Sequence, residues 1–254
     1  MKNSVIKFSF LSMAAVVAFS SCRKDEDAPP TTTPDPTTVN LEISHMAGAN
    51  ALTFNTNYTD GFGNVFTITR ADMYVNGFTL VDDVDTVLFE DNNHYLLKPT
   101  VTSVSFGEIA ATHVHALSFN VGVDTTLNLT VDPTTQPAGS ALGVQSPSMY
   151  WSWSSGYRFV VIEGNADRNA DGVAETPYQF HIGMNALYRR VELHVHTDMT
   201  ANTANMIHME IDYLRFFDGI DMSLASSSTH TMDNMMLATQ FINNVDSVFS
   251  VHTH

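Results

Sequence analysis

The chain has 254 residues, of which 44% are hydrophobic, 10% aromatic and 15% charged, which excludes wholesale disorder and allows one large domain or two small ones. Its 11 Lys and Arg residues stand against 27 Asp and Glu, a formal net charge of −16 with neutral histidine. This balance argues against nucleic-acid binding, which needs clustered basic residues, and favours cations as partners. The 11 His and 13 Met residues supply ligands for borderline and soft metals.

The N-terminus predicts a secreted lipoprotein. Residues 1–21 resemble a signal peptide, with two lysines before an apolar run that is too short to span a bilayer. Cys22, the only cysteine, follows in a context that resembles a bacterial lipobox, where the thiol is lipidated and becomes the mature N-terminus. An ordinary secretory signal with an incidental thiol is the alternative. We expect an outer-membrane lipoprotein that faces either the periplasm or the cell surface.

Residues 22–38 are expected to form the lipidated N-terminus and a Pro/Thr-rich tether that cannot bury a core. Apolar and polar residues then alternate with a period of two, which predicts strands. The expected strands are 39–45, 52–58, 65–74, 78–81, 86–90, 94–97, 103–106, 113–122, 158–163, 178–182, 191–196 and 207–214. Helical spacing predicts a helix over 232–245, with Thr231 as its cap. We therefore predict one all-β domain over 39–254, an antiparallel two-sheet sandwich with one or two short helices near the C-terminus.

A calcium loop is predicted over 167–175. Oxygen donors at positions 1, 3 and 5, a glycine at 6 and an acid at 9 match the first part of an EF-hand loop. The expected ligands are Asp167, Asn169, Asp171, Val173 through its carbonyl, and Glu175. Position 12 is Tyr178 instead of glutamate, and no helical pattern flanks the loop. We thus expect a structural ion between two strands; a solvated turn without an ion is the alternative.

Histidines occur in three His-x-His pairs, which place two imidazoles on one face of a strand about 6–7 Å apart. The pairs are His113 with His115, His194 with His196, and His252 with His254. Such a pair can chelate copper or zinc. Solvent-facing strand positions also tolerate histidine, and a lone histidine such as His45 or His181 is more often structural.

The segment 149–159 contains both tryptophans, Trp151 and Trp153. Two residues apart in an extended strand, their rings would face the same side. Taken alone, this pattern is more typical of core packing than of a binding site.

The same segment, Met149-Tyr150-Trp151-Ser152-Trp153-Ser154-Ser155-Gly156-Tyr157-Arg158-Phe159, resembles the signature of the MbnP-like family. These are periplasmic or surface copper-binding proteins, associated with methanobactin in some bacteria. Further similar stretches lie at 67–80, 119–124, 177–183 and 243–249, so that the resemblance covers about 39–251.

The resemblance implies copper binding by histidines, assisted in some members by a tryptophan that a dihaem peroxidase-like partner oxidises to kynurenine. His45 and His181 stand in family-like contexts and are the first expected ligands. His113 and His115 could complete a site, whereas His194 and His196 are candidates by spacing alone. Trp151 or Trp153 would be the oxidised residue.

We therefore expect a lipid-anchored extracytoplasmic protein that captures or handles copper and is not an enzyme. The chain lacks the common nucleophile, zinc-protease, phosphate-loop and dinucleotide motifs. The alternative is a calcium-stabilised surface module for protein or glycan binding. A hydrolase or oxidoreductase with an unconventional site is a third reading, without positive evidence.

Overall fold

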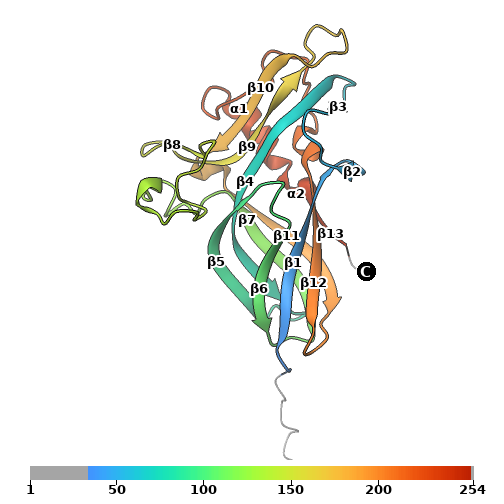
Figure 1. Cartoon of the computed structure of the whole chain (residues 1–254), viewed down its shortest axis with the longest axis vertical. Coiled ribbons are helices and arrows are strands. Elements are labelled where there is room, and N and C mark those ends of the chain that lie inside the picture. Colours follow the sequence, from blue (N-terminus) through green and yellow to red (C-terminus); the bar gives the residue numbers. More distant parts are fainter. Residues whose placement is uncertain (1–33, 253–254) are drawn as a thin grey trace, which may run out of the picture. The chain divides into compact units, whose positions relative to one another are not determined.

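Two β-sheets form the framework of residues 34–252, the part of the chain that this computed structural model describes (Figure 1). The five-stranded sheet contains β1 (Thr37–Ala47), β2 (Asn50–Ala51), β6 (Ser103–Ile109), β12 (Ala204–Asp212) and β13 (Phe249–His252). The eight-stranded sheet contains β3 (Asn57–Thr59), β4 (Val65–Val81), β5 (Val87–Leu97), β7 (His113–Val121), β8 (Tyr150–Ser152), β9 (Gly156–Ala166), β10 (Thr176–Gly183) and β11 (Arg189–Asp198). The all-β sandwich that the sequence predicts is confirmed.

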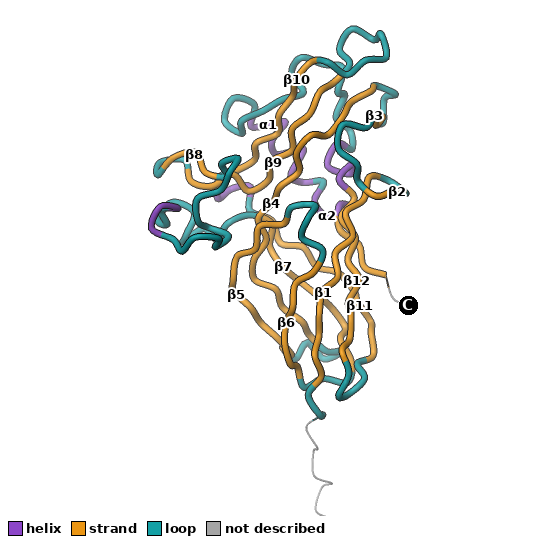
Figure 2. The backbone as a smooth tube through the Cα atoms, viewed as in Figure 1, coloured by secondary structure: helices purple, strands orange, loops and turns teal. Residues whose placement is uncertain are grey.

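The helices are short, and the two α-helices lie near the C-terminus (Figure 2). They are α1 (Met235–Asn243), α2 (Val245–Val248) and the 3-10 turns η1 (Pro133–Thr135), η2 (Asn185–Leu187) and η3 (Tyr213–Phe217). Phe241 of α1 stacks on Phe180 of β10 and on Phe216 of η3, with ring centroids 4.5 and 4.8 Å apart. The helix thus packs against both β10 and η3. Within the described residues, no helix is both long enough and apolar enough to cross a bilayer.

The five-stranded sheet is mixed, because β1 runs parallel to β12 and antiparallel to β2 and β6. This corrects the purely antiparallel arrangement expected from the sequence, since alternation reveals which face is buried but not the direction of the neighbouring strand. In β1, Val39, Leu41 and Ile43 are buried, and the residues between them are partly exposed. One face of this sheet therefore packs on the core and the other meets solvent.

The 17-residue strand β4 organises the larger sheet. Its first part pairs with β3 and β9, and its second part pairs with β5 and β7. The strand order β10-β9-β4-β7-β11 follows from this shared strand. As a result, β4 connects two separate regions of the surface. One lies beside β9 and β10, and the other lies beside β7 and β11.

The main core lies between the two sheets and is rich in Phe, Val, Ile and Leu. A second, smaller core includes Tyr74, Tyr157 and Phe159 and lies beneath the long connection 122–149. The hydroxyl of Tyr157 donates to the carbonyl of Leu142 (2.8 Å), and that of Tyr74 donates to the carbonyl of Ala141 (2.9 Å). These bonds hold the connection over this part of the sheet.

Several predicted elements differ from the observed ones. The expected strands 65–74 and 78–81 are one strand, as are 86–90 and 94–97, and 52–58 is replaced by β2 and β3. The expected strand 207–214 ends at Asp212, where η3 begins. The α1 cap is Asn234, whose side chain accepts from the Leu237 N–H, and not Thr231. Thr231 has a φ of +73° and lies outside the helix.

The predicted signal peptide, the lipidation at Cys22 and most of the predicted tether lie outside the described residues, as does His254. These remain predictions.

Candidate functional site

The structure brings His181 together with His230, a residue that the sequence analysis missed. His181 lies in β10 and is 5% exposed, whereas His230 lies in the exposed connection between η3 and α1. Their Nδ1 atoms are 3.0 Å apart and their ring centroids 4.7 Å apart. We call these two residues the histidine pair.

The protonation of the pair follows from its neighbours. Nε2 of His181 is 2.7 Å from Oε1 of Glu163, and a carboxylate only accepts, so Nε2 carries the hydrogen. Nδ1 of neutral His181 is then an acceptor, and His230 donates to it from its own Nδ1. The amide of Gln179 lies 2.6 Å from Nε2 of His230 and donates to it. Rotation of this amide would present its oxygen instead and so support the opposite tautomer of His230.

A network of charged side chains supports the histidine pair through Glu163. Glu163 also accepts from Nη1 of Arg70 (3.2 Å), and Arg70 donates from Nε to Asp72 (2.7 Å). The hydrogen bond from His181 is the main cause that lowers the pKa of Glu163. Burial lowers the pKa of His181, although the bond to Glu163 opposes this. Burial is the larger effect and favours a neutral imidazole, whose free electron pair on Nδ1 faces His230.

The connection that carries His230 is fixed to the edge of β10. Thr229 and Phe180 form an isolated parallel bridge, and the Thr231 hydroxyl donates to the His181 carbonyl (2.7 Å). Asp233 accepts from the backbone N–H of His230 (2.8 Å). Nothing in the spacing of His230 along the sequence signals this pairing, because the contact depends on a loop that adds to a sheet edge.

A pocket of about 430 Å³ opens beside the histidine pair. Its lining includes His230, Trp151, Met184 and Met232. Trp151 in β8 lies against Gly183 of β10, where a Cβ atom would approach the indole to 2.4 Å. The pocket therefore combines one imidazole of the pair with an indole and two methionine side chains. We call this pocket the aromatic pocket.

The two tryptophans do not share one face, which corrects the expectation from their spacing. Trp153 lies in the turn between β8 and β9 and is 80% exposed. Trp151 is only partly exposed, and the guanidinium carbon of Arg158 lies 5.6 Å from its ring centroid.

His45 lies in the other sheet and has both ring nitrogens engaged. Its Nδ1 is 2.8 Å from the hydroxyl of Tyr213, and its Nε2 is 2.8 Å from the carbonyl of Val101. Burial lowers the pKa of His45, against the effect of the bond to Val101. In this arrangement His45 joins β1 to its neighbours and presents no free nitrogen to an ion.

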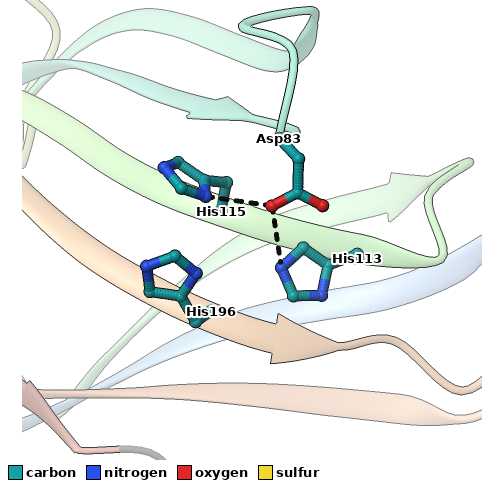
Figure 3. A group of neighbouring side chains, drawn as sticks. All are labelled: Asp83, His113, His115 and His196. Carbon is teal, nitrogen blue, oxygen red and sulfur yellow. Dashed lines mark hydrogen bonds and ion pairs between the residues drawn. The ribbon is translucent and has the colours of Figure 1, made fainter.

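A second group of histidines lies at the far end of the larger sheet (Figure 3). It comprises Asp83 from the β4–β5 turn, His113 and His115 from β7, and His196 from β11. One ligand atom from each residue lies within 4.8 Å of the others. We call these four residues the strand-end cluster. The neighbouring His194 has its ring centroid 5.6 Å from that of His115. His252 lies in β13 of the other sheet and is paired with Glu210 at 2.9 Å.

The predicted calcium loop connects β9 and β10. Its side chains converge, since Nδ2 of Asn169 donates to Asp171 (3.1 Å) and to Glu175 (2.9 Å). Asp167 accepts from the N–H of Gly172 (2.7 Å), and Val173 donates its own N–H to Asp171 (2.9 Å). Gly172 has a φ of +88°, as the sharp turn requires. The loop thus gathers its oxygens, with the Asn169 amide lying between two carboxylates.

Comparison with known proteins agrees with this architecture. A family model described as MbnP matches residues 36–236. A solved structure, MbnP from Methylosinus trichosporium, superposes with a TM-score of 0.57 at 16% identity and covers 85% of this chain and 98% of that one. At this identity the superposition supports the fold alone. Among curated proteins, no sequence matches the chain.

Proposed function

Because this chain belongs to the MbnP family, we propose that it is a copper-binding protein of the cell envelope, and that His181 and His230 bind the ion. The observation that carries the proposal is the 3.0 Å approach of two Nδ1 atoms beside the aromatic pocket. Glu163 orients one ring and Gln179 the other, as the outer partners of metal-bound histidines commonly do.

The spacing and chemistry of the pair suit copper. Two imidazole nitrogens on one tetrahedral ion, at about 2.0–2.1 Å each, stand roughly 3.3 Å apart, so the pair needs to open only slightly. The ion would take the place of the hydrogen between the rings, and His230 would carry its hydrogen on Nε2 instead. Soft thioethers line the pocket at Met184 and Met232, which favours Cu(I) over harder ions.

Trp151 is the tryptophan that we propose for oxidation to kynurenine. It lines the same pocket as His230, whereas Trp153 stands in an exposed turn. A dihaem peroxidase-like partner, which the family resemblance implies, would perform this oxidation. The chain itself would act as a copper carrier and not as an enzyme.

The remaining parts of the proposal concern attachment and stability. We propose that Cys22 anchors the chain by lipid to the outer membrane, on its periplasmic or outer face. We also propose that Ca²⁺ binds among Asp167, Asn169, Asp171 and Glu175 and stiffens the β9–β10 connection. Excess Ca²⁺ would then raise the Tm in wild type but not in Asp171→Ala.

The central test is a titration with Cu(I) under reducing conditions, in competition with a chromophoric chelator. The protein is the untagged chain 23–254, since a polyhistidine tag would itself bind copper. We expect one tightly bound Cu(I) per chain in wild type and a large loss of affinity in His230→Ala. His252→Ala is the matched control, because it removes an exposed imidazole that lies in the other sheet and does not line the pocket.

Two results would contradict the proposal. One is wild-type affinity in both His230→Ala and His181→Ala. The other is kynurenine located by peptide mass spectrometry at Trp153 and not at Trp151 in protein isolated from its native host. Preserved thermal unfolding in His230→Ala confirms that a lost affinity reflects a lost ligand.

A further inference from the structure

We propose that the strand-end cluster is a second metal site, which binds a divalent first-row transition ion independently of the histidine pair. Three imidazoles and one carboxylate form a nitrogen–oxygen set that suits Zn²⁺ or Cu²⁺, in contrast to the thioether-lined pocket beside His230. The proposal does not rest on the copper function proposed above.

The orientation of His113 leaves an electron pair that faces a negative oxygen. Nδ1 of His113 donates to Oδ1 of Asp198 (2.8 Å), which fixes the hydrogen on Nδ1. Nε2 of neutral His113 then faces Oδ1 of Asp83 at 3.6 Å. Two electron-rich atoms in such an arrangement attract a cation between them. Asp198 acts here as the outer carboxylate that commonly orients a metal-bound histidine.

The other two imidazoles approach the same place. Nδ1 of His115 is 3.0 Å from Oδ1 of Asp83, and the ring centroid of His196 is 4.3 Å from that of His115. Figure 3 shows the three rings and the carboxylate facing one another from two neighbouring strands and the turn above them. Ligand atoms of a tetrahedral zinc ion stand roughly 3.3 Å apart, so modest rotations of these side chains would complete the coordination.

A bulge in β11 positions His196. Against β7, the pairing passes from His194 opposite Ala116 to Thr197 opposite Val114, so β11 carries one extra residue. His196 has a φ of +45°, a left-handed conformation that costs a non-glycine residue about 1 kcal/mol or more. Bulges commonly re-aim a side chain. Here the bulged residue contributes a ring to the cluster.

The cluster is open to ions. The side chains of His113 and His115 are 26% and 28% exposed and that of Asp83 is 64% exposed. Further carboxylates of the same turn, Asp82 and Asp85, add negative potential. An ion can therefore enter without conformational opening, and its charge is balanced by nearby acids.

The test is calorimetric titration of the untagged chain 23–254 with Zn²⁺, together with the visible spectrum after Co²⁺ addition. Tetrahedral Co²⁺ absorbs far more strongly than the hydrated octahedral ion and so reports protein coordination. We expect one Zn²⁺ and a tetrahedral spectrum in wild type. Asp198→Asn removes an outer partner and should weaken Zn²⁺ binding by roughly 10- to 100-fold. His196→Ala removes a ligand and should weaken it further.

The variants separate the two sites. Because His196→Ala can also alter the bulge, a second variant is needed. Asp83→Asn changes only an exposed turn residue and should also weaken Zn²⁺ binding. His230→Ala and His252→Ala should leave the Zn²⁺ affinity and the Co²⁺ spectrum unchanged. The proposal is overturned by wild-type Zn²⁺ affinity in both His196→Ala and Asp83→Asn, by an octahedral Co²⁺ spectrum in wild type, or by Zn²⁺ binding that is lost in His230→Ala.

Discussion

The contact between Gly183 and Trp151 predicts that Gly183→Ala disturbs both the stability of the protein and its aromatic pocket. An added Cβ would lie 2.4 Å from Cζ3 and 3.0 Å from Cη2 of Trp151, and 2.6 Å from the carbonyl oxygen of Tyr157. Carbon atoms in contact are normally about 3.5–4.0 Å apart, so the indole must move by about 1 Å. The Tyr157 carbonyl belongs to β9 and cannot move without shifting the strand.

We expect Gly183→Ala to lower the free energy of unfolding by about 1–3 kcal/mol, which is typical when extra atoms are forced into a packed site. For a domain of this size this corresponds to a Tm lower by about 2–12 °C. The fluorescence of Trp151 should shift to longer wavelength as the indole leaves the β10 surface. This is measured in a Trp153→Phe background, so that Trp151 is the only tryptophan.

Gly61→Ala is the matched control. Gly61 lies in the β3–β4 turn, and a Cβ there would meet no atom within 4 Å. If Gly183→Ala and Gly61→Ala unfold at the same temperature and give the same Trp151 emission, the close approach of Trp151 to β10 is wrong. A lower Tm with unchanged emission would show that only the Tyr157 carbonyl limits the space.

Three further predictions concern single side chains. Burial raises the pKa of Asp60, but hydrogen bonds, foremost from the Met222 N–H, outweigh this and lower it overall. Asp60→Asn should lower the free energy of unfolding by about 1–3 kcal/mol at pH 7, measured in urea. The difference between wild type and variant should shrink at low pH, as the wild-type carboxylate takes up a proton. An equal difference at pH 7 and pH 2 would contradict this. His45→Ala should lower the free energy of unfolding by a similar amount, because it leaves the buried Tyr213 hydroxyl unpaired. Its Cu(I) affinity should be unchanged; weakened copper binding would instead identify His45 as a ligand. Glu163→Gln should lower Cu(I) affinity by about 10- to 100-fold in the chelator assay, and wild-type affinity would rule out an orienting role for Glu163.

The sequence predicts the fold class well, because strand alternation directly reflects burial. In β11, Val191, Leu193 and Val195 are buried, while His194 and His196 are exposed. The sequence predicted that these two imidazoles share one face of the strand, and their ring centroids lie 5.9 Å apart. The bulge that turns His196 toward its neighbours could not be foreseen, since no glycine or proline marks it.

The histidine pair was only half predictable. His181 lies in a recognisable strand with a family-like context, but His230 is 49 residues later in a connection without periodicity. Its position depends on Thr229 pairing with the edge of β10 and on Asp233 fixing the turn. Such tertiary contacts leave no repeat in the sequence. The parallel pairing of β1 with β12 was missed for the same reason.

The length of β4 also sets the distance between the histidine pair and the strand-end cluster. Asp72 and Val161 are paired in register, and Val161 is paired with His181, so the histidine pair lies level with Asp72. The nine residues from Asp72 to Val81 span about 30 Å toward the strand-end cluster.

The chain enters the domain at the cluster end, where Pro34 and His113 line the same surface hollow (Figure 1). The aromatic pocket lies about 30 Å from this end of the domain. Ions at the two sites would be separated by several screening lengths, so that loading one site leaves the affinity of the other unchanged.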